Sequence, residues 1–571
     1  MSLYLAAAQD QASESSSEKL VDFSLYQIYP RSFKDSDGDG VGDLKGIMSK
    51  LDHLVDINVD AFWLSPIYPS PMVDFGYDIQ NFTDVDPVFG TMQDLENLLE
   101  AAHNKSLKVI LDLVPNHSSD KHEWFEKSLR NIEPYNNYYV WHKGRVLENG
   151  TVVAPNNWVS VFAGSAWTWR EERQAYYLHQ FTKEQPDLNY NNKNLAREMK
   201  NIIRFWLGKG VDGFRVDAVN FLCEDTRYLD EPLTGNTDDP NNSGYTKKIY
   251  SMDQPQTYEI VLSWRQVMEE FEQPKFMMME AYANVSSTMK YYQYGATYPF
   301  NFGFITDLGN NSAAVDFKNM VDTWMSNMPA GSIPNWVPGN HDKPRLMTRF
   351  GPKRARAVTL MTLLLPGVSV TYNGEEIGME DTWLSWKETV DPSGCNAGKD
   401  GYETASRDPA RTPFQWDDST SAGFSTNPKT WLRVNDNYKT VNLAAEKKDS
   451  KSYYNFYKKV SSLKKSSNFK RTNLVTKLLN ENVFAFARES KSIGYYVVIN
   501  FGDKDEIVDL SVFDNISHQP LLYYDIGTVL PSSMNATDIT KIHVPAEGFV
   551  VYVDEKTKPT SQYYGETFTF Q

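Results

Sequence analysis

The strongest constraint on the fold is an alternation, eight times over, of short apolar segments with longer amphipathic ones. Several apolar segments are nearly continuous, such as "KVILDLV" and "KFMMMEA", as in strands buried on both faces of a parallel sheet. The intervening segments have helical periodicity, as in "NLAREMKNIIRFWLGKG". Because parallel strands need helical crossovers, the pattern predicts an α/β fold, a (β/α)8 TIM barrel. The expected strands are 24–30, 61–67, 108–114, 213–219, 275–281, 300–305, 333–339 and 367–373.

Two connections are too long for a single crossover. Residues 118–188 are polar and aromatic and predict a subdomain inserted over the barrel mouth after the third strand, and residues 221–262 form a second excursion. After about residue 470 the pattern changes to short alternating runs such as "GYYVVINF", which are typical of an antiparallel β domain. The predicted division is a barrel at 20–117 and 189–468, an inserted subdomain at 118–188, a C-terminal β domain at 469–556, and flexible tails at 1–19 and 557–571.

The charge balance restricts the partners. A net charge of −17 argues against nucleic acid or an anionic membrane as the main partner and favours a neutral substrate. Aromatic residues make up 13% of the chain, which fits either a large core or stacking surfaces for sugar rings. No apolar run is long enough to span a membrane.

Cysteines and glycosylation acceptors indicate the compartment. Two cysteines, Cys223 and Cys395, do not make a disulfide framework, and the sequence leaves their pairing open. Nine acceptor sequons favour a secretory route and hence an extracellular protein. Asn116 is expected to stay unmodified because it adjoins a candidate active-site histidine. The acceptors are Asn81, Asn104, Asn116, Asn149, Asn241, Asn284, Asn310, Asn515 and Asn535.

Candidate catalytic residues are found where the predicted strands end. The active site of a TIM barrel lies at the carboxyl ends of its strands. Three carboxylates that converge on one mouth indicate glycoside chemistry, which needs a nucleophile and a proton donor on either side of the bond. A lone carboxylate at such a position is as readily a buried ion pair or a cap, so the convergence carries the argument. The candidates are His117, Arg215, Asp217, Glu280, His341 and Asp342.

Neighbouring residues suggest the roles of two carboxylates. Arg215 and Asp217 are two positions apart on a strand and share a face, so the guanidinium should favour an ionised Asp217, as a nucleophile requires. Glu280 follows "FMMM", an apolar setting that should raise its pKa and keep its proton available.

The stretch "KDSDGDGVGD" predicts a metal loop. Its oxygen ligands would be Asp35, Asp37, Asp39, the Val41 carbonyl and Asp43, and hard oxygens suit Ca²⁺, with Mg²⁺ as an alternative. An EF-hand needs Glu at the twelfth position, where this chain has Gly46, so the loop is not a calcium sensor. The other interpretation is an acidic turn without metal. Because the loop follows the first strand, away from the catalytic strand ends, the cation is expected to be structural.

Four stretches together resemble the conserved regions of the α-amylase family of glycoside hydrolases. They are "DLVPNHSSD", "GFRVDAV", "MMMEAY" and "VPGNHDKPR". The segments "QPDLNY", "DSDGDGVGDLKGI" and "SRDPARTPFQW" resemble features of the oligo-1,6-glucosidase and α-glucosidase branch, and "TVDPSGCNAG" is most similar to insect maltases, including gut-surface enzymes of mosquitoes. The resemblance covers residues 20–555.

The resemblance implies a role for each matching residue. Asp217 would be the nucleophile, Glu280 the acid/base and Asp342 the stabiliser of the transition state. Arg411 would pair with Asp74 and close the far end of the pocket, although Arg407 lies only four residues away. The residues expected to bind the terminal glucose are Asp74, Tyr77, His117, Arg215, His341 and Arg411.

The activity implied is that of a retaining, exo-acting α-glucosidase, or maltase, with an Asp217–Glu280 carboxyl separation of ~5 Å. Ala218, the small residue after the nucleophile, goes with α-1,4 cleavage in this branch. Maltose and maltooligosaccharides are therefore the expected substrates, with sucrose a further candidate. "NFLCED" differs from the Pro-His that is often found there in insect maltases, which leaves the aglycone preference open.

Three alternatives are open at this point. An amino-acid transporter heavy chain shares the fold but needs a transmembrane segment and usually lacks part of the catalytic set, whereas here the set is complete and no such segment is found, which argues against this alternative. A gut-surface enzyme of this kind can also dock a bacterial toxin. The same intermediate also permits glucosyl transfer to another sugar. The protein is expected outside the cell, secreted or attached to the membrane by a lipid anchor, although "TKPTSQYYGETFTFQ" is not the hydrophobic tail of an anchor signal. The oligomeric state is not readable.

Overall fold

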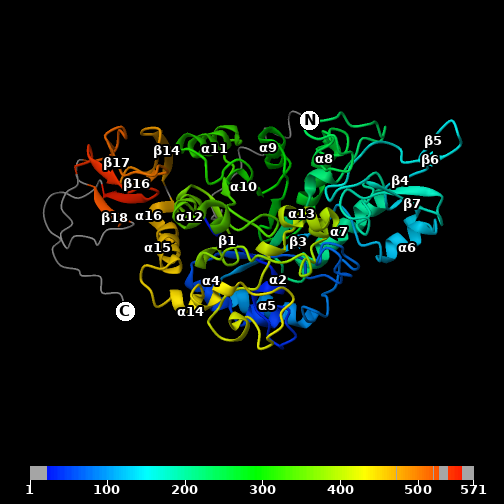
Figure 1. Ribbon diagram of the computed structural model, residues 1–571, viewed down its shortest axis with the longest axis horizontal. Helices are drawn as coiled ribbons and strands as arrows, with labels where there is room; N and C mark the ends of the chain where they lie inside the picture. The colour runs from blue at the N-terminus through cyan, green and yellow to red at the C-terminus, as the bar shows by residue number, and fades with distance from the viewer. Residues whose placement is uncertain (1–21, 471, 518–519, 526–537, 556–571) are drawn as a thin grey trace.

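The computed structural model describes residues 22–470, 472–517, 520–525 and 538–555. Eight parallel strands form one sheet in the order β11-β10-β9-β3-β2-β1-β13-β12, which confirms the predicted (β/α)8 barrel (Figure 1). The strands are β1 (Ser24–Ile28), β2 (Ala61–Leu64), β3 (Lys108–Leu113), β9 (Gly213–Val216), β10 (Phe276–Met279), β11 (Tyr298–Pro299), β12 (Asn335–Trp336) and β13 (Val368–Tyr372).

Side-chain bonds of Asn335 connect the two edge strands, β11 and β12. Its Nδ2 donates to the carbonyl oxygen of Pro299 at 2.5 Å, and its Oδ1 accepts the backbone N–H of Asn301 at 2.7 Å. The strands β11 and β12 are the two ends of the strand order and do not pair with each other, so backbone groups between them need other partners. The buried amide of Asn335 supplies one donor and one acceptor for such groups. The sheet is thereby nearly closed.

The crossover helices follow from the amphipathic patterns. In α7 (Lys193–Gly208), Leu195, Met199, Ile203 and Trp206 recur at helical spacing and are all buried. In α5 (Met92–Asn104), Thr91 and Asp94 form a reciprocal capping box at the start. The other long helices of the barrel are α8 (Pro255–Met268), α9 (Val285–Gln293), α11 (Ala314–Asn327), α12 (Leu346–Leu364) and α15 (Tyr453–Lys465).

The insertion between β3 and α7 forms a small subdomain with its own core. It contains α6 (Glu123–Leu129) and a three-stranded sheet of β4 (Trp141–His142), β8 (Ala175–Leu178) and β7 (Trp167–Arg170). Trp158 and Trp167 are buried in its core. The excursion after β9 is irregular up to α8. Figure 1 shows the insertion at one end of the molecule.

A C-terminal antiparallel sheet lies at the other end (Figure 1). Its strands run in the order β14-β15-β16-β20-β18, as the alternating runs predicted. Phe501 stacks on Phe317 of α11 with ring centroids 3.9 Å apart, so the sheet packs against the barrel. The strands are β14 (Asn473–Leu478), β15 (Val483–Glu489), β16 (Ile493–Asn500), β18 (Leu521–Asp525) and β20 (Phe549–Glu555). The exact domain limits stay predictions, and the predicted tails lie outside the described residues.

The structure bears on the cysteine pairing, which the sequence left open, on the acceptor Asn116 and on membrane-spanning helices. Cys223 is buried and Cys395 is exposed, and both thiols are free. Asn116 is buried, which fits the expectation that it carries no glycan. Within the described ranges, no helix has both the length and the hydropathy needed to cross a bilayer.

Candidate functional site

A cavity of about 470 Å³ opens at the carboxyl ends of the barrel strands. Phe162 and Phe181 of the insertion form part of its wall. A larger cavity of about 740 Å³ adjoins it beyond Tyr282, but none of the three predicted catalytic carboxylates lines that space. The chemistry therefore identifies the smaller cavity as the candidate site. The predicted residues that line it are Asp74, Tyr77, His117, Asp217, Glu280, His341 and Asp342, together with Arg407.

The Arg215 guanidinium binds three carboxylates at once. Its Nη1 donates to Asp112 at 2.9 Å and to Asp217 at 2.6 Å, and its Nη2 lies 3.2 Å from Glu280. Arg215 is almost fully buried. One positive charge thus faces three acids in a site of low dielectric, so a proton must remain in the group near neutral pH.

Burial dominates the protonation of the two central acids. It raises the pKa of Glu280 to about 7, in the direction predicted from its apolar setting. Burial also raises the pKa of Asp217 to about 7, although Arg215 acts in the opposite direction. The sequence argument therefore captured the effect of the guanidinium on Asp217 and missed the larger effect of desolvation.

The backbone after Asp217 is held in an uncommon conformation. Ala218 has a φ of 45°, in the left-handed region, and the 3-10 turn η2 (Val219–Phe221) follows it. Its N–H donates to Glu280 Oε2 at 2.7 Å. Strained backbone of this kind persists where the surroundings enforce it, often at functional sites. Here it fixes the Glu280 carboxylate close to the chain segment that carries Asp217.

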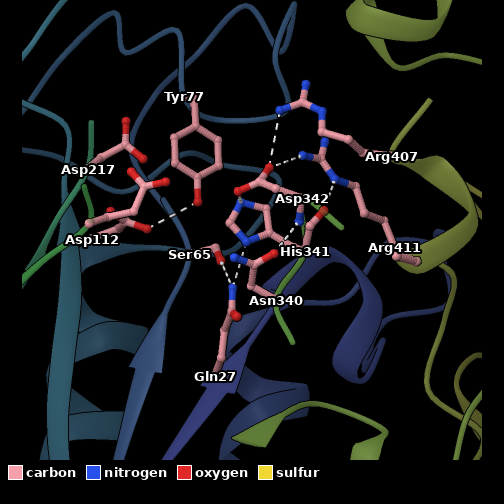
Figure 2. A network of polar contacts seen from close by, with 12 residues as sticks. Gln27, Ser65, Tyr77, Asp112, Asp217, Asn340, His341, Asp342, Arg407 and Arg411 are labelled. Carbon is pink, nitrogen blue, oxygen red and sulfur yellow. Dashed lines mark hydrogen bonds and ion pairs between the residues drawn. The ribbon is translucent and has the colours of Figure 1, made fainter. Parts of the chain in front are cut away.

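Asp342 lies across the cavity in a positively charged setting. Its Oδ1 is 3.0 Å from Arg411 Nη2 and 3.3 Å from Arg407 Nη1. Burial opposes ionisation, but the guanidinium groups of Arg407 and Arg411 outweigh it and hold the pKa of Asp342 well below its usual range. Figure 2 shows Asp217 and Asp342 on either side of the Tyr77 ring. Asp342 is therefore an anion at neutral pH.

The two histidines are neutral. Burial lowers the pKa of His117 to about 3 and places that of His341 well below its ordinary value. His341 Nδ1 lies 2.7 Å from Gln27 Nε2, and its ring stacks on Tyr77 at 5.3 Å (Figure 2). Gln185 Nε2 lies 3.1 Å from His117 Nε2. Both imidazoles are held as neutral hydrogen-bonding groups.

The predicted partner of Asp74 is corrected. Arg407, not Arg411, binds Asp74, with Nη2 2.6 Å from Oδ1. Arg411 instead donates from Nε to the His341 carbonyl at 2.8 Å and pairs with Asp342. The two arginines flank the short turn η4 (Asp408–Ala410), and this irregular segment gives no periodicity from which their directions could be predicted.

Several residues of the site were not identified from the sequence. Asp112 accepts bonds from Arg215, Trp63 and Tyr77, and its place in "DLVPNH" five residues before His117 was an available signal. Asn220 is buried and lines the cavity, and its Nδ2 has no hydrogen-bond partner. Asn220 is the first residue of "NFLCED", the stretch that left the aglycone preference open, but no role was predicted for its side chain.

Three aspartates of the predicted metal loop lie close together. Ligand oxygens of Asp35, Asp37 and Asp39 lie within 4.8 Å of one another. Asp43 is elsewhere engaged: its carboxylate accepts the N–H groups of Ser36 and Gly46 and caps α3 (Leu44–Met48). The Asp35 carboxylate already accepts three backbone N–H groups and the Ser425 hydroxyl. Each carboxylate keeps further lone pairs, so the loop stays a predicted metal site.

A second group of oxygen atoms lies between the barrel and the insertion. Asn116 Oδ1 and Asp187 Oδ2 are buried and have no hydrogen-bond partner. Burial raises the pKa of Asp187 to about 7 and that of Glu224 well above its usual value, and the charge of Asp187 raises the latter further. Buried oxygens without donors are the ligand set that a hard divalent cation prefers.

Comparison with known proteins agrees with this geometry. The alpha-amylase catalytic domain family matches residues 27–472. The chain belongs to the α-amylase family. It is 60% identical over 538 residues to an alpha-glucosidase of Apis mellifera, covering 94% of each chain. It is 48% identical to a salivary alpha-glucosidase of Anopheles gambiae, covering 84% of this chain and 83% of the relative. The structure of the α-glucosyl transfer enzyme XgtA superposes with a TM-score of 0.83 at 31% identity, covering 93% of this chain and 99% of XgtA. The predicted family is confirmed.

Proposed function

We propose that the protein is an exo-acting, retaining α-glucosidase that removes terminal α-1,4-linked glucose through a covalent glucosyl-Asp217 intermediate. The observation that carries the proposal is the sharing of one guanidinium, that of Arg215, by Asp217 and Glu280 inside a cavity with Asp342 opposite. The alpha-glucosidase of Apis mellifera, at 60% identity, supports the same activity.

The arrangement suits a double displacement. Asp217 would attack the anomeric carbon while Glu280 gives its proton to the departing oxygen, and Glu280 would then take a proton from the water that releases glucose. The raised pKa of Glu280 keeps that proton available near neutral pH. The anion Asp342 and the neutral histidines would hold the hydroxyls of the sugar, whose positive charge develops in the transition state.

The ion pair of Asp74 and Arg407 supports exo action. It lies at one end of the cavity, and the Arg407 guanidinium covers the Phe162 ring at 4.8 Å. A pocket closed in this way would accept one terminal glucose and no longer chain beyond it. Each reaction would therefore remove one glucose unit from the end of the substrate.

The substrate class rests on the residues that follow the nucleophile. Ala218 matches the small residue that goes with α-1,4 cleavage in this branch. The unpartnered Nδ2 of Asn220 supplies a donor that an aglycone hydroxyl would satisfy. Maltose and maltooligosaccharides are the proposed substrates, with sucrose as the next candidate.

Glucosyl transfer is the second candidate, because XgtA is described as an α-glucosyl transfer enzyme. Transfer and hydrolysis share the glucosyl-enzyme and differ only in the acceptor. An extracellular location is supported by the salivary alpha-glucosidase of Anopheles gambiae. Lipid anchoring, N-glycosylation and toxin docking stay predictions.

A structural Ca²⁺ is proposed between the barrel and the insertion. Asn116, Asp187 and Glu224 would hold it, and it would fix the loop that carries His117 against the insertion. The loop around Asp35 and Asp37 is the other candidate, as its sequence predicted. In neither place would the cation reach the carboxylates of the reaction.

A substrate panel tests the proposal. We expect release of p-nitrophenol from p-nitrophenyl α-glucoside, faster hydrolysis of maltose than of isomaltose or trehalose, and glucose as the first product from maltooligosaccharides. Inactivity on every α-glucoside, or internal cleavage of the longer chains, contradicts the proposal. Product analysis at high maltose separates transfer from hydrolysis, since transfer yields trisaccharides.

A further inference from the structure

Asp391 occupies the N-cap position of a helix, but its side chain binds an arginine and does not cap that helix. It precedes α13 (Pro392–Ala405), and its side chain makes no capping bond to that helix. The residue is fully buried. Its Oδ1 accepts from Arg407 Nε at 2.9 Å and from Nη2 at 2.5 Å, and its Oδ2 accepts the Arg407 backbone N–H at 2.8 Å. Both oxygens are thus committed to one arginine.

These bonds fix the plane of the Arg407 guanidinium. Its five N–H donors form a rigid fork, so holding Nε and Nη2 determines where Nη1 points. The same Nη2 reaches Asp74. Nη1 lies 3.3 Å from Asp342, and Figure 2 shows Arg407 directed toward this carboxylate. The carboxylate of Asp391 therefore decides how Arg407 approaches two residues of the site.

Asp391 also offsets the positive charge beside Asp342. Arg411 Nη1 lies 3.9 Å from Asp391 Oδ1, while Arg411 Nη2 pairs with Asp342. Burial disfavours the anion, but Arg407 and Arg411 outweigh it and keep the pKa of Asp391 below its ordinary value. Without this charge, Arg411 would have only Asp342 as its carboxylate partner, and Arg407 would have only Asp74 and Asp342.

We propose that Asp391 is a positioning residue for the glucose-binding end of the cavity. It orients Arg407 toward Asp74. It also weakens the electrostatic attraction of both arginines for Asp342, so that the Asp342 carboxylate stays free to bind a sugar hydroxyl. The inference rests on the proposed α-glucosidase function and adds to it a residue that makes no contact with the sugar.

The test uses the nearly isosteric Asp391→Asn variant and a double-mutant cycle with Arg407→Gln. Removing the anion should raise KM for maltose about 10-fold and weaken competitive inhibition by glucose to a similar extent, with a smaller change in kcat. In the Arg407→Gln background, Asp391→Asn should have little further effect, because the two residues act as a unit. The matched control is Asp22→Asn, which breaks the buried Asp22–Arg488 pair far from the cavity and should lower Tm while leaving KM unchanged.

Each outcome decides the inference. The inference is overturned if Asp391→Asn has a KM and a glucose inhibition constant within twofold of wild type. It is also overturned if the effects of Asp391→Asn and Arg407→Gln on KM multiply in the double variant. In both cases the wild-type activity, and with it the proposed function, still stands. A wild type that is inactive on every α-glucoside overturns the proposed function, and the inference falls with it. Should Asp391→Asn fail to fold, Asp391→Glu keeps the charge on a longer side chain and should give an intermediate rise in KM. An unchanged KM in that variant also overturns the inference.

Discussion

Arg407 Nη2 lies 2.6 Å from Asp74 Oδ1, although 333 positions separate the two residues in the chain. Both residues line the cavity that also holds Asp217, Glu280 and Asp342. A buried, charged hydrogen bond of this geometry is strong and directional. It fixes these two side chains relative to each other in the cavity wall.

Arg407→Gln should therefore weaken binding of the terminal glucose. Loss of a charged hydrogen bond costs about 1.5–3 kcal/mol, which corresponds to a rise in KM for maltose of roughly 10- to 150-fold. Arg488→Gln is a suitable control because Arg488 is more deeply buried than Arg407 and pairs with Asp22 outside the site. Equal KM values for Arg407→Gln and wild type would mean that the Asp74–Arg407 pair does not contact substrate.

Glu280→Gln should remove the alkaline limb of the pH–activity profile. The proton donor works only when protonated, so kcat/KM of the wild type should fall as pH rises through about 7, the value to which burial raises the pKa of Glu280. The variant should be slower by roughly 10²- to 10⁴-fold on maltose and less so on p-nitrophenyl α-glucoside, whose leaving group needs no proton. A variant profile that keeps the wild-type alkaline limb would assign that limb to another group.

The alternation of strand and helix was enough to predict the barrel, because each strand is buried on both faces and its apolar run is visible in the sequence. The same reasoning located Asp217 and Glu280, since a barrel gathers its strand ends at one mouth. It could not distinguish Arg407 from Arg411, which lie in an irregular segment. It also missed Asn220, which matters because its buried Nδ2 lacks a hydrogen-bond partner. The sequence does not show this, since it depends on how the neighbouring side chains pack.

Glu375→Gln should flatten the pH dependence of stability. Glu375 is buried, its Oε1 has no partner, and burial raises its pKa to about 8. The pKa of this carboxyl is higher in the folded protein than its value of about 4.3 in the unfolded chain. Its contribution to the free energy of unfolding is therefore full below the unfolded pKa and is lost as pH rises through about 8. Wild type should therefore lose Tm between pH 6 and pH 9 by more than the variant does. The exposed Glu126→Gln serves as the control, and an identical loss in all three proteins would show that Glu375 is not the responsive group.

Chelation should lower thermal stability before it lowers turnover. If Ca²⁺ joins the barrel to the insertion, a chelator should reduce Tm while turnover measured at once at low temperature stays near its starting value. Asp187→Asn should abolish the recovery of Tm on adding Ca²⁺, and Asp37→Asn should keep it. The reverse pattern would place the cation in the Asp35 loop. A Tm unaffected by chelator or Ca²⁺ in the wild type would remove the structural metal from the account.

The most direct test of the central claim is identification of the residue that becomes glucosylated. Wild-type protein is incubated with 5-fluoro-α-D-glucopyranosyl fluoride, which slows release of the glycosyl-enzyme, and peptides are then analysed by mass spectrometry. One added fluoroglucosyl group is expected on the peptide that contains Asp217, and none in Asp217→Asn. An adduct on another residue, or turnover of the reagent with inversion and no adduct, would contradict it.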